Sequence, residues 1–247
     1  MDAEFDTVAE WTAQVATELG PDYYVPAGCR GSGSPAGLDW LIDQMKLRPG
    51  HLLLDSGAGV GGPAAYAAQS RSVQPVLVEP EVGACRAART LFDHPVVCAE
   101  GSALPVADAS FDAAWSLGVL CTTADQLALL QQLRRTVRRG GRIGLLIFMA
   151  HGAIPANQVE GNHFPTRNDL VGLFKQSSLE VEQSLSTADL PAIPQSWNER
   201  VDAVDAALVA RHGHKRPWQL AERQSDQIGQ LLDGGSLTGE LLVLRQA

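Results

Sequence analysis

A short glycine-rich stretch is the part of this sequence best suited to binding a small ligand. The apolar run 52–54 predicts a buried strand, and Asp55 follows it directly. Alternating glycines come next, at Gly57, Gly59 and Gly61. They let the backbone turn sharply and let a ligand approach the main chain. Pro63 and the alanines after it favour a helix. The stretch therefore predicts strand, loop and helix, and open α/β sheets bind nucleotide-like ligands at that strand end.

The same loop fits two kinds of ligand. Gly57-x-Gly59-x-x-Gly62 satisfies the dinucleotide fingerprint, and Glu79 follows it by about twenty residues, as that fingerprint expects. Asp55-x-Gly57-x-Gly59-x-Gly61 instead resembles the signature of class I S-adenosylmethionine (SAM) methyltransferases. Glu79 ends a predicted strand over residues 75–79. A carboxylate there accepts both hydroxyls of a ribose, which suits either cofactor.

Later motifs favour the methyltransferase interpretation. Residues 100–105 (EGSALP) are similar to the family's Gly-Asp-Ala-x-x-Leu-Pro, with Ser102 in place of the acid that normally accepts from the adenine amino group. Phe111-Asp112 opens a predicted fourth strand, as it does in the family. Residues 137–146 (VRRGGRIGLL) resemble Leu-Arg-Pro-Gly-Gly-Arg-Leu-Leu-Leu. The resemblance runs over residues 51–184, and the Gly-Gly-Pro-Ala segment points to the small-molecule branch, with sterol, tocopherol and natural-product methyltransferases.

The resemblance implies a cofactor site at the strand ends. The loop would hold the methionine part of SAM, Glu79 the ribose, and Asp55 both the loop and the amino group. The residues predicted to bind the cofactor are Asp55, Gly57, Ala58, Gly59, Gly61, Glu79, Pro80, Ser102, Ala103, Leu117 and Gly118. The product would be S-adenosyl-L-homocysteine. We expect no metal, because the sequence has neither an HExxH motif nor a paired-carboxylate cluster.

His163 is the predicted catalytic base, in a loop expected over residues 149–165. Neutral histidine accepts protons near pH 7, and in this family the loop after the fifth strand commonly borders the acceptor. His151 is the rival, and a structural role is the alternative for His163. The residues predicted to line the acceptor site are Tyr23, Tyr24, Arg30, Cys121, His151 and Trp197. For Tyr23 and Tyr24, packing under the N-terminal helix is an equal alternative.

The elements that must position these residues predict a Rossmann-like α/β fold. The resemblance implies that helices cover both faces of a seven-stranded, mostly parallel sheet, whose last strand (residues 240–245) lies antiparallel between the fifth and the sixth. The fifth strand is expected at residues 142–148, after a helix that ends at residues 138–141. We predict a single domain, with a helical cap at residues 1–46 over the open end of the sheet and a SAM-binding core at 47–185 and 239–247. Residues 186–238 should insert a helical hairpin, which we read as a lid in preference to an interface.

Composition limits the partners of the chain. Its 247 residues carry a net charge of −9, which disfavours nucleic acid as a partner. The four cysteines form no CxxC pair, which argues against a zinc site or a disulfide framework. There is no signal peptide, and no apolar run approaches the ~20 residues of a membrane span. We therefore expect a cytoplasmic protein without membrane partners that acts on a small molecule, with a homodimer left open.

The predicted function is SAM-dependent methyl transfer to a small-molecule acceptor by in-line displacement, in secondary metabolism. Two alternatives stay open on the sequence. One is an NAD(P)-binding oxidoreductase. The other is a non-catalytic, methyltransferase-like regulator that binds SAM, which the replacement of the usual acid by Ser102 keeps open.

Overall fold

A sheet of seven strands in the order β3-β2-β1-β4-β5-β7-β6 forms the centre of the computed structural model, which describes residues 2–31, 33–152, 154 and 161–247. The strands are β1 (Leu52–Ser56), β2 (Gln74–Glu79), β3 (Val96–Cys98), β4 (Phe111–Leu117), β5 (Val137–Ala150), β6 (Leu179–Ser186) and β7 (Leu237–Gln246). β1 to β5 pair in parallel, whereas β7 runs antiparallel to both β5 and β6. The predicted fold class is confirmed, including the position of the last strand.

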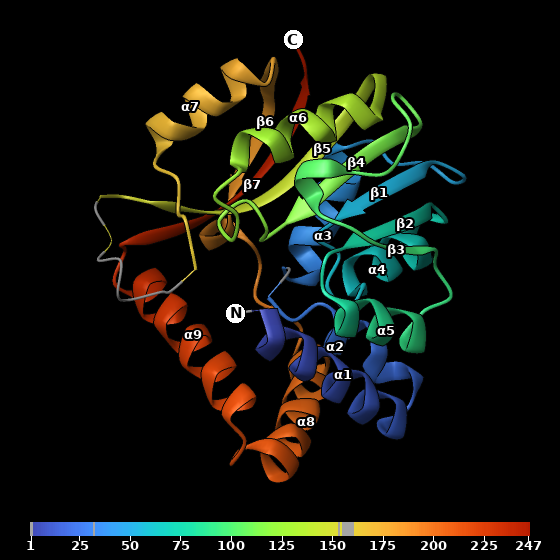
Figure 1. The fold of residues 1–247 in the computed structure, drawn as a ribbon, viewed down its shortest axis with the longest axis vertical. Coiled ribbons are helices and arrows are strands. Elements are labelled where there is room, and N and C mark those ends of the chain that lie inside the picture. Colours follow the sequence, from blue (N-terminus) through green and yellow to red (C-terminus); the bar gives the residue numbers. More distant parts are fainter. Residues whose placement is uncertain (1, 32, 153, 155–160) are drawn as a thin grey trace.

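Helices cover both faces of this sheet (Figure 1). α6 (Gln126–Thr136) and α7 (Arg167–Gln176) pack on one face, in the cluster that contains Leu54. α3 (Pro35–Gln44) and α4 (Gly62–Arg71) pack on the other, in the cluster that contains Leu53. Successive strand side chains point to opposite faces, and Leu53 and Leu54 of β1 are both fully buried because each face is covered by helices. This double burial fixes β1, and with it the loop that follows, in the middle of the molecule.

Local signals set several helix ends as the sequence predicts. The side chain of Ser34 accepts a hydrogen bond from Gly37 N and caps α3, with Pro35 in the first turn. α7 begins with the predicted capping box, in which Thr166 and Asp169 exchange hydrogen bonds with each other's backbone N–H. α4 begins after Gly61, whose φ is +87°.

β5 begins earlier than predicted. The expected helix end at residues 138–141 is wrong, since α6 stops at Thr136 and Val137 already pairs with Phe111 of β4. The register then shifts, so that Arg142 lies opposite Ala113. The two arginines and two glycines of residues 138–141 are typical of a helix end. An ion pair between Arg138 and Asp112 instead holds this segment against β4.

A group of helices outside the β–α alternation packs beside the sheet. It consists of α1 (Asp2–Leu19), the 3-10 turn η1 (Pro21–Tyr23), α2 (Tyr24–Gly28), α8 (Gln195–His212) and α9 (Arg216–Asp233). α1 lies along α5 (Val82–Leu91) and against α8 and α9, so only its N-terminal turn reaches the strand ends (Figure 1). The segment after Tyr23, which its glycines predict to be a loop, is partly helical, as α2. The hairpin predicted from Pro194 to Asp233 is present as α8 and α9.

None of the helices in the described ranges has the length and apolar character that crossing a membrane requires.

Candidate functional site

The glycine loop lies at the carboxyl ends of β1 and β4, where the strand order changes direction. Gly57, Gly59 and Gly61 have φ values of +75°, +54° and +87°, which favour glycine. A Cβ on Gly57 would lie 2.3 Å from Cγ2 of Val119, so no larger residue fits there. A Cβ on Gly59 would meet only Phe5 among the described residues within 4 Å, at 3.7 Å. The space beside Gly59 is therefore open to a ligand.

Glu79 holds this loop from the end of β2. Its Oε2 accepts a hydrogen bond from Gly59 N at 2.8 Å, and its Oε1 accepts one from Glu81 N at 3.1 Å. Burial raises the pKa of Glu79; the two backbone hydrogen bonds lower it, and the charges of Asp6 and Glu100 raise it further. A carboxylate offers about four lone pairs. Glu79 can therefore accept hydrogen bonds from a ligand while it fixes the loop.

Asp55 is a buried carboxylate at the base of the loop. Burial raises its pKa to about 7; the Trp115 indole lowers this pKa, and the charge of Glu79 raises it. Within the described part of the chain, neither Asp55 Oδ2 nor Trp115 Nε1 has a hydrogen-bond partner of acceptable geometry. A buried charged group without partners is costly. This orphaned oxygen fits a ligand that carries a positive charge or an N–H donor.

The N-terminal segment crosses the first turn of α4. A Cβ on Gly62 would lie 2.2 Å from the carbonyl carbon of Gly28 and 2.4 Å from Cys29 N. A Cβ on Gly118, after β4, would lie 3.2 Å from Gly31 O. Residues 28–31, here called the strap, therefore run from the start of α4 to the end of β4. Cys29 in the strap is 4% exposed, and burial together with the charge of Asp55 raises the pKa of its thiol.

The strap and the local charges argue against a dinucleotide. The pyrophosphate of a dinucleotide binds at the N-terminus of the helix after the glycine loop. Here the backbone of Gly28 and Cys29 occupies the space beside Gly62. The carboxylates of Asp55 and Glu79 also lie beside the loop, where they repel a pyrophosphate and attract a sulfonium cation.

The other predicted cofactor residues gather at the same edge of the sheet. Ala58 is buried in the loop, Pro80 follows β2, Ser102 and Ala103 lie in the 3-10 turn η2 (Gly101–Ala103) after β3, and Leu117 and Gly118 end β4. Gly118 has a φ of +79°, and its N–H donates to Leu146 O at 2.9 Å. Parallel strands bring these residues together because their carboxyl ends meet at one edge. The contacts of each residue with a cofactor stay a prediction.

His163 is positioned through its backbone. Its N–H donates to Cys121 O at 2.6 Å, and its carbonyl accepts from Gln126 Nε2 at 2.7 Å, while its side chain is exposed. Cys121 is 2% exposed. His151 is also exposed, and its Nε2 lies 3.0 Å from Thr238 Oγ1. Both histidines follow β5, and their proposed roles stay predictions.

The predicted acceptor residues of the N-terminal segment pack against other helices. Tyr23 and Tyr24 are half-buried in the cluster of α1, α5 and α8, and Tyr24 meets Phe92 edge-on at a centroid distance of 6.4 Å. These contacts favour the packing alternative for both tyrosines.

Arg30 and Trp197 connect the hairpin to the rest of the chain. The Arg30 guanidinium lies 4.9 Å from the ring centre of Trp218 and 3.3 Å from Asp205 Oδ1. Trp197 packs edge-on against Tyr66 of α4, at a centroid distance of 6.2 Å. Both side chains therefore have structural partners, whatever they contribute to an acceptor site.

Sequence reasoning missed Asp6 and, apart from Arg30, the strap as parts of the site. Asp6 Oδ1 accepts a hydrogen bond from Gly83 N at 2.6 Å, in the first turn of α5. A Cβ on Gly83 would lie 2.5 Å from Asp6 O. The two residues are 77 positions apart. No local motif links such distant positions, and only the fold brings them together.

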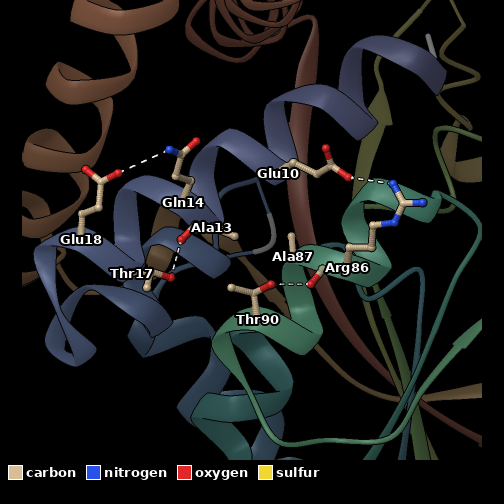
Figure 2. Close-up of a pocket in the computed structure, with 8 residues that line it drawn as sticks. All are labelled: Glu10, Ala13, Gln14, Thr17, Glu18, Arg86, Ala87 and Thr90. Atoms are coloured by element: carbon tan, nitrogen blue, oxygen red, sulfur yellow. Dashed lines mark hydrogen bonds and ion pairs between the residues drawn. The ribbon is translucent and has the colours of Figure 1, made fainter.

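A surface groove of about 420 Å³ lies between α1 and α5 (Figure 2). Its lining residues are Glu10, Ala13, Gln14, Thr17, Glu18, Arg86, Ala87 and Thr90. An ion pair between Glu10 and Arg86, with an N–O distance of 3.2 Å, spans it. The described residues that line the groove include none of the predicted site residues, so we place the candidate site at the glycine loop.

Residues 54–145 match the family model described as "Methyltransferase domain". This region of the chain, 92 of its 247 residues, therefore resembles a methyltransferase domain. The matched region begins in β1 and ends in β5, so it holds the glycine loop and Glu79, Ser102 and Gly118. The resemblance found in the sequence is confirmed, and the comparisons lend no support to the oxidoreductase or regulator alternatives.

The methyltransferase domain has relatives that act on small molecules. The chain is 33% identical over 174 residues to 24-methylenesterol C-methyltransferase 2 of Oryza sativa subsp. japonica, which covers 62% of this chain and 48% of that protein. The chain thus spans about half the length of this relative.

Solved structures share the fold. The [4+2]-cyclase SpnF aligns with a TM-score of 0.72 at 18% identity, over 99% of this chain and 95% of that one. Geranyl diphosphate C-methyltransferase from Streptomyces coelicolor A3(2), in complex with Mg2+, geranyl diphosphate and S-adenosyl-L-homocysteine, aligns with a TM-score of 0.62 at 14% identity, over 86% of this chain and 79% of that one. In the described ranges, no group of three or more His, Cys, Asp or Glu residues is arranged to hold a metal ion.

Proposed function

We propose that the whole protein transfers a methyl group from SAM to a small-molecule acceptor. The observation that carries this proposal is the buried Asp55 carboxylate, whose Oδ2 interacts with the Trp115 indole without a hydrogen bond of good geometry, beside a glycine loop that Glu79 fixes and the strap covers. Asp55, the glycine loop and Glu79 lie within the region that matches the methyltransferase family model, and the strap precedes that region. The arrangement offers an open space at Gly59 and a negative environment, both of which fit a ligand that is a sulfonium and an ammonium ion.

Bound at this loop, SAM would supply an electrophilic methyl group on sulfur. The residues of the chain bind SAM and orient it. The loop from Gly57 to Gly61 holds the methionine part, Asp55 interacts with its ammonium group, and Glu79 accepts hydrogen bonds from the ribose hydroxyls. Ser102 accepts from the adenine amino group more weakly than an acid would. The strap keeps water from the loop, so positioning does most of the work in an in-line displacement.

The proposal specifies the acceptor site in less detail than the cofactor site. The acceptor would enter between the strand ends and α9, with α8 and α9 as a lid and His163 or His151 as a base for an oxygen or nitrogen acceptor. The sterol methyltransferase named above is the relative that supports a small apolar acceptor, and a place in secondary metabolism is part of the proposal. The predicted limits of cap, core and insertion, a cytoplasmic location and the option of a homodimer belong to the same proposal.

Calorimetry followed by methyl tracing tests the proposed function. The purified chain is titrated with SAM, S-adenosylhomocysteine and NAD+, and we expect binding of the first two only. It is then incubated with SAM labelled on the methyl carbon and a panel of small apolar metabolites. Label in an acceptor supports the proposal. Binding of NAD+ in preference to SAM would overturn it. The label must be followed because a [4+2]-cyclase shares this fold, and fold does not fix function.

A further inference from the structure

Two cysteines meet at the end of β2, next to the residue proposed to bind the ribose. Cys85, in the first turn of α5, donates its thiol to Glu79 O at 3.2 Å. Cys98, the last residue of β3, donates its thiol to Pro80 O at 3.3 Å. The two sulfur atoms therefore contact the carbonyl oxygens of consecutive residues. Neither cysteine has a role in the proposed transfer of a methyl group.

The strand register supports this proximity. Cys98 lies directly opposite Glu79 in the parallel pair of β2 and β3, and neighbouring strands are about 4.8 Å apart. Glu79 O also accepts a hydrogen bond from Ala99 N at 3.1 Å, so Cys85 Sγ and the chain next to Cys98 meet at one oxygen atom. The two cysteines thus approach from different elements, since α5 packs against both β2 and β3.

The two thiols differ in accessibility. Cys98 is exposed on β3, the edge strand of the sheet, whereas Cys85 is 4% exposed. Burial and the neighbouring Cys98 raise the pKa of Cys85 to about 12, and the Arg89 guanidinium lowers it. Cys85 therefore stays protonated at neutral pH. An oxidant from solution reaches Cys98 first.

We propose that Cys85 and Cys98 form a dithiol that a hydroperoxide oxidises to a disulfide, and that this disulfide weakens cofactor binding at the adjacent loop. In the first step, Cys98 sulfur attacks hydrogen peroxide, which gives a sulfenic acid and one water. In the second, Cys85 sulfur displaces the hydroxyl of the sulfenic acid, which forms the S–S bond and releases a second water. The two thiols lose two electrons and two protons, and the peroxide is reduced to water. The effect on cofactor binding rests on the proposed function.

The link to the site is Glu79. The disulfide removes both S–H donors from the carbonyls of Glu79 and Pro80 and ties the first turn of α5 to β3. Glu79 ends β2, which pairs with β3 and precedes α5 in the chain. Its carboxylate fixes the loop through Gly59 N at 2.8 Å. A shift in the backbone at Glu79 changes the position of that carboxylate. The oxidised protein therefore presents a displaced loop.

The test compares the reduced and the peroxide-treated full chain. Intact mass and thiol titration should show the loss of two hydrogen atoms and two free thiols after peroxide. Calorimetry with SAM should show affinity reduced about tenfold or more in the oxidised protein, and restored by dithiothreitol. Cys98→Ser removes the exposed thiol and should keep full affinity after peroxide. In Cys85→Ala, peroxide should add oxygen atoms to Cys98 without forming a disulfide, because the second thiol is absent.

Two outcomes overturn the inference. One is four intact thiols after peroxide treatment, or an unchanged loss of thiols in Cys98→Ser, which would place the reaction among Cys29, Cys85 and Cys121. The other is a disulfide that forms while SAM affinity stays unchanged. If the reduced protein fails to bind SAM, the proposed function is wrong, and the proposed effect of the disulfide on SAM affinity is wrong as well. The mass and thiol measurements still decide whether the dithiol closes.

Discussion

At the scale of single residues, Asp55 is a carboxylate whose charge the folded chain does little to stabilise. Its pKa in the folded protein, about 7, lies above the ordinary value of 3.8. The native state therefore binds a proton that the unfolded chain has already lost between these two values. The stability of the ligand-free protein should fall as pH rises from about 4 to about 7, because ionisation of Asp55 then opposes folding.

The first prediction uses this linkage. Asp55→Asn should raise the free energy of unfolding at pH 8 by about 2–4 kcal/mol and flatten its dependence on pH, as measured by denaturant titration. In the wild type, SAM affinity should rise from pH 6 to pH 8, because a cation binds the ionised carboxylate. Asp55→Asn should bind SAM more weakly, without that rise. Asp169→Asn, the same change in the capping box of α7, serves as the control for cofactor affinity. A wild-type affinity that does not change over this pH range would contradict the role of Asp55.

The second prediction concerns Glu79. Glu79→Ala should weaken SAM binding by about 1–3 kcal/mol in calorimetry, since it removes hydrogen bonds to a charged acceptor. Glu79→Gln keeps an oxygen that can accept from Gly59 N, so this variant should lose cofactor affinity with less loss of thermal stability. Equal affinity in wild type and Glu79→Ala would remove Glu79 from the site.

The third prediction separates a base from a structural histidine. His163→Ala should lower turnover by roughly 10²–10⁴-fold with SAM affinity intact, and remove an ionisation from the pH–rate profile. The hydrogen bonds of His163 to Cys121 and Gln126 involve its backbone and the ring is exposed, so the thermal midpoint should change little. His151→Ala is the matched comparison. Turnover that survives in His163→Ala but falls in His151→Ala would assign the base to His151.

At the scale of secondary-structure elements, the crossing of α2 and α4 depends on two glycines in contact. A Cβ on Gly28 would lie 2.9 Å from Gly62 Cα, and a Cβ on Gly62 would lie 2.2 Å from the Gly28 carbonyl carbon. Both clashes are with backbone atoms, which cannot rotate away. The strap can cover the loop only because both side chains are absent.

The fourth prediction tests this crossing with a matched pair of glycines. Gly62→Ala should destabilise the protein by about 2 kcal/mol or more and weaken SAM binding, because the strap must move away from the loop. Gly229→Ala, in the interior of α9, adds a Cβ with no described atom within 4 Å and should stabilise the protein by up to about 1 kcal/mol. Thermal melts measure the change in stability, and calorimetry measures the change in SAM affinity. A stable, SAM-binding Gly62→Ala variant would show that the strap does not constrain the loop.

The fifth prediction concerns the hairpin as a lid. Its turn is fixed to α1, since His212 stacks on Trp11 at 3.9 Å and Lys215 Nζ lies 4.8 Å from the Trp11 ring centre. Cofactor and acceptor together should slow hydrogen exchange in the second half of α9, residues 225–233, with little change at residues 212–215. Equal exchange in free and bound protein would favour a packing or dimer role.

Sequence reasoning succeeded where neighbouring residues decide the structure. Strand β1, the glycine loop and α4 form one continuous stretch, so their pattern was readable, and the family resemblance supplied the strand order. It failed where a contact joins distant segments. Nothing near Gly62 indicates that Gly28 packs on it, and nothing near Gly83 indicates Asp6. The early start of β5 was missed because its pairing with Phe111 overrides two glycines.

At the scale of the whole molecule, β7 determines when the sheet can be completed. β5 and β6 are not paired with each other in the described sheet, since β7 lies between them, with Ile143 opposite Leu244 and Leu185 opposite Leu241. During synthesis, the outer edge of β5, a strand that includes Leu145 and Ile147, therefore stays unpaired until residues 237–246 have left the ribosome. An unpaired apolar edge is a template for pairing with other chains. The aggregation hazard of this fold is thus greatest after β5 has formed and before β7 has emerged, while the hairpin between them is being synthesised.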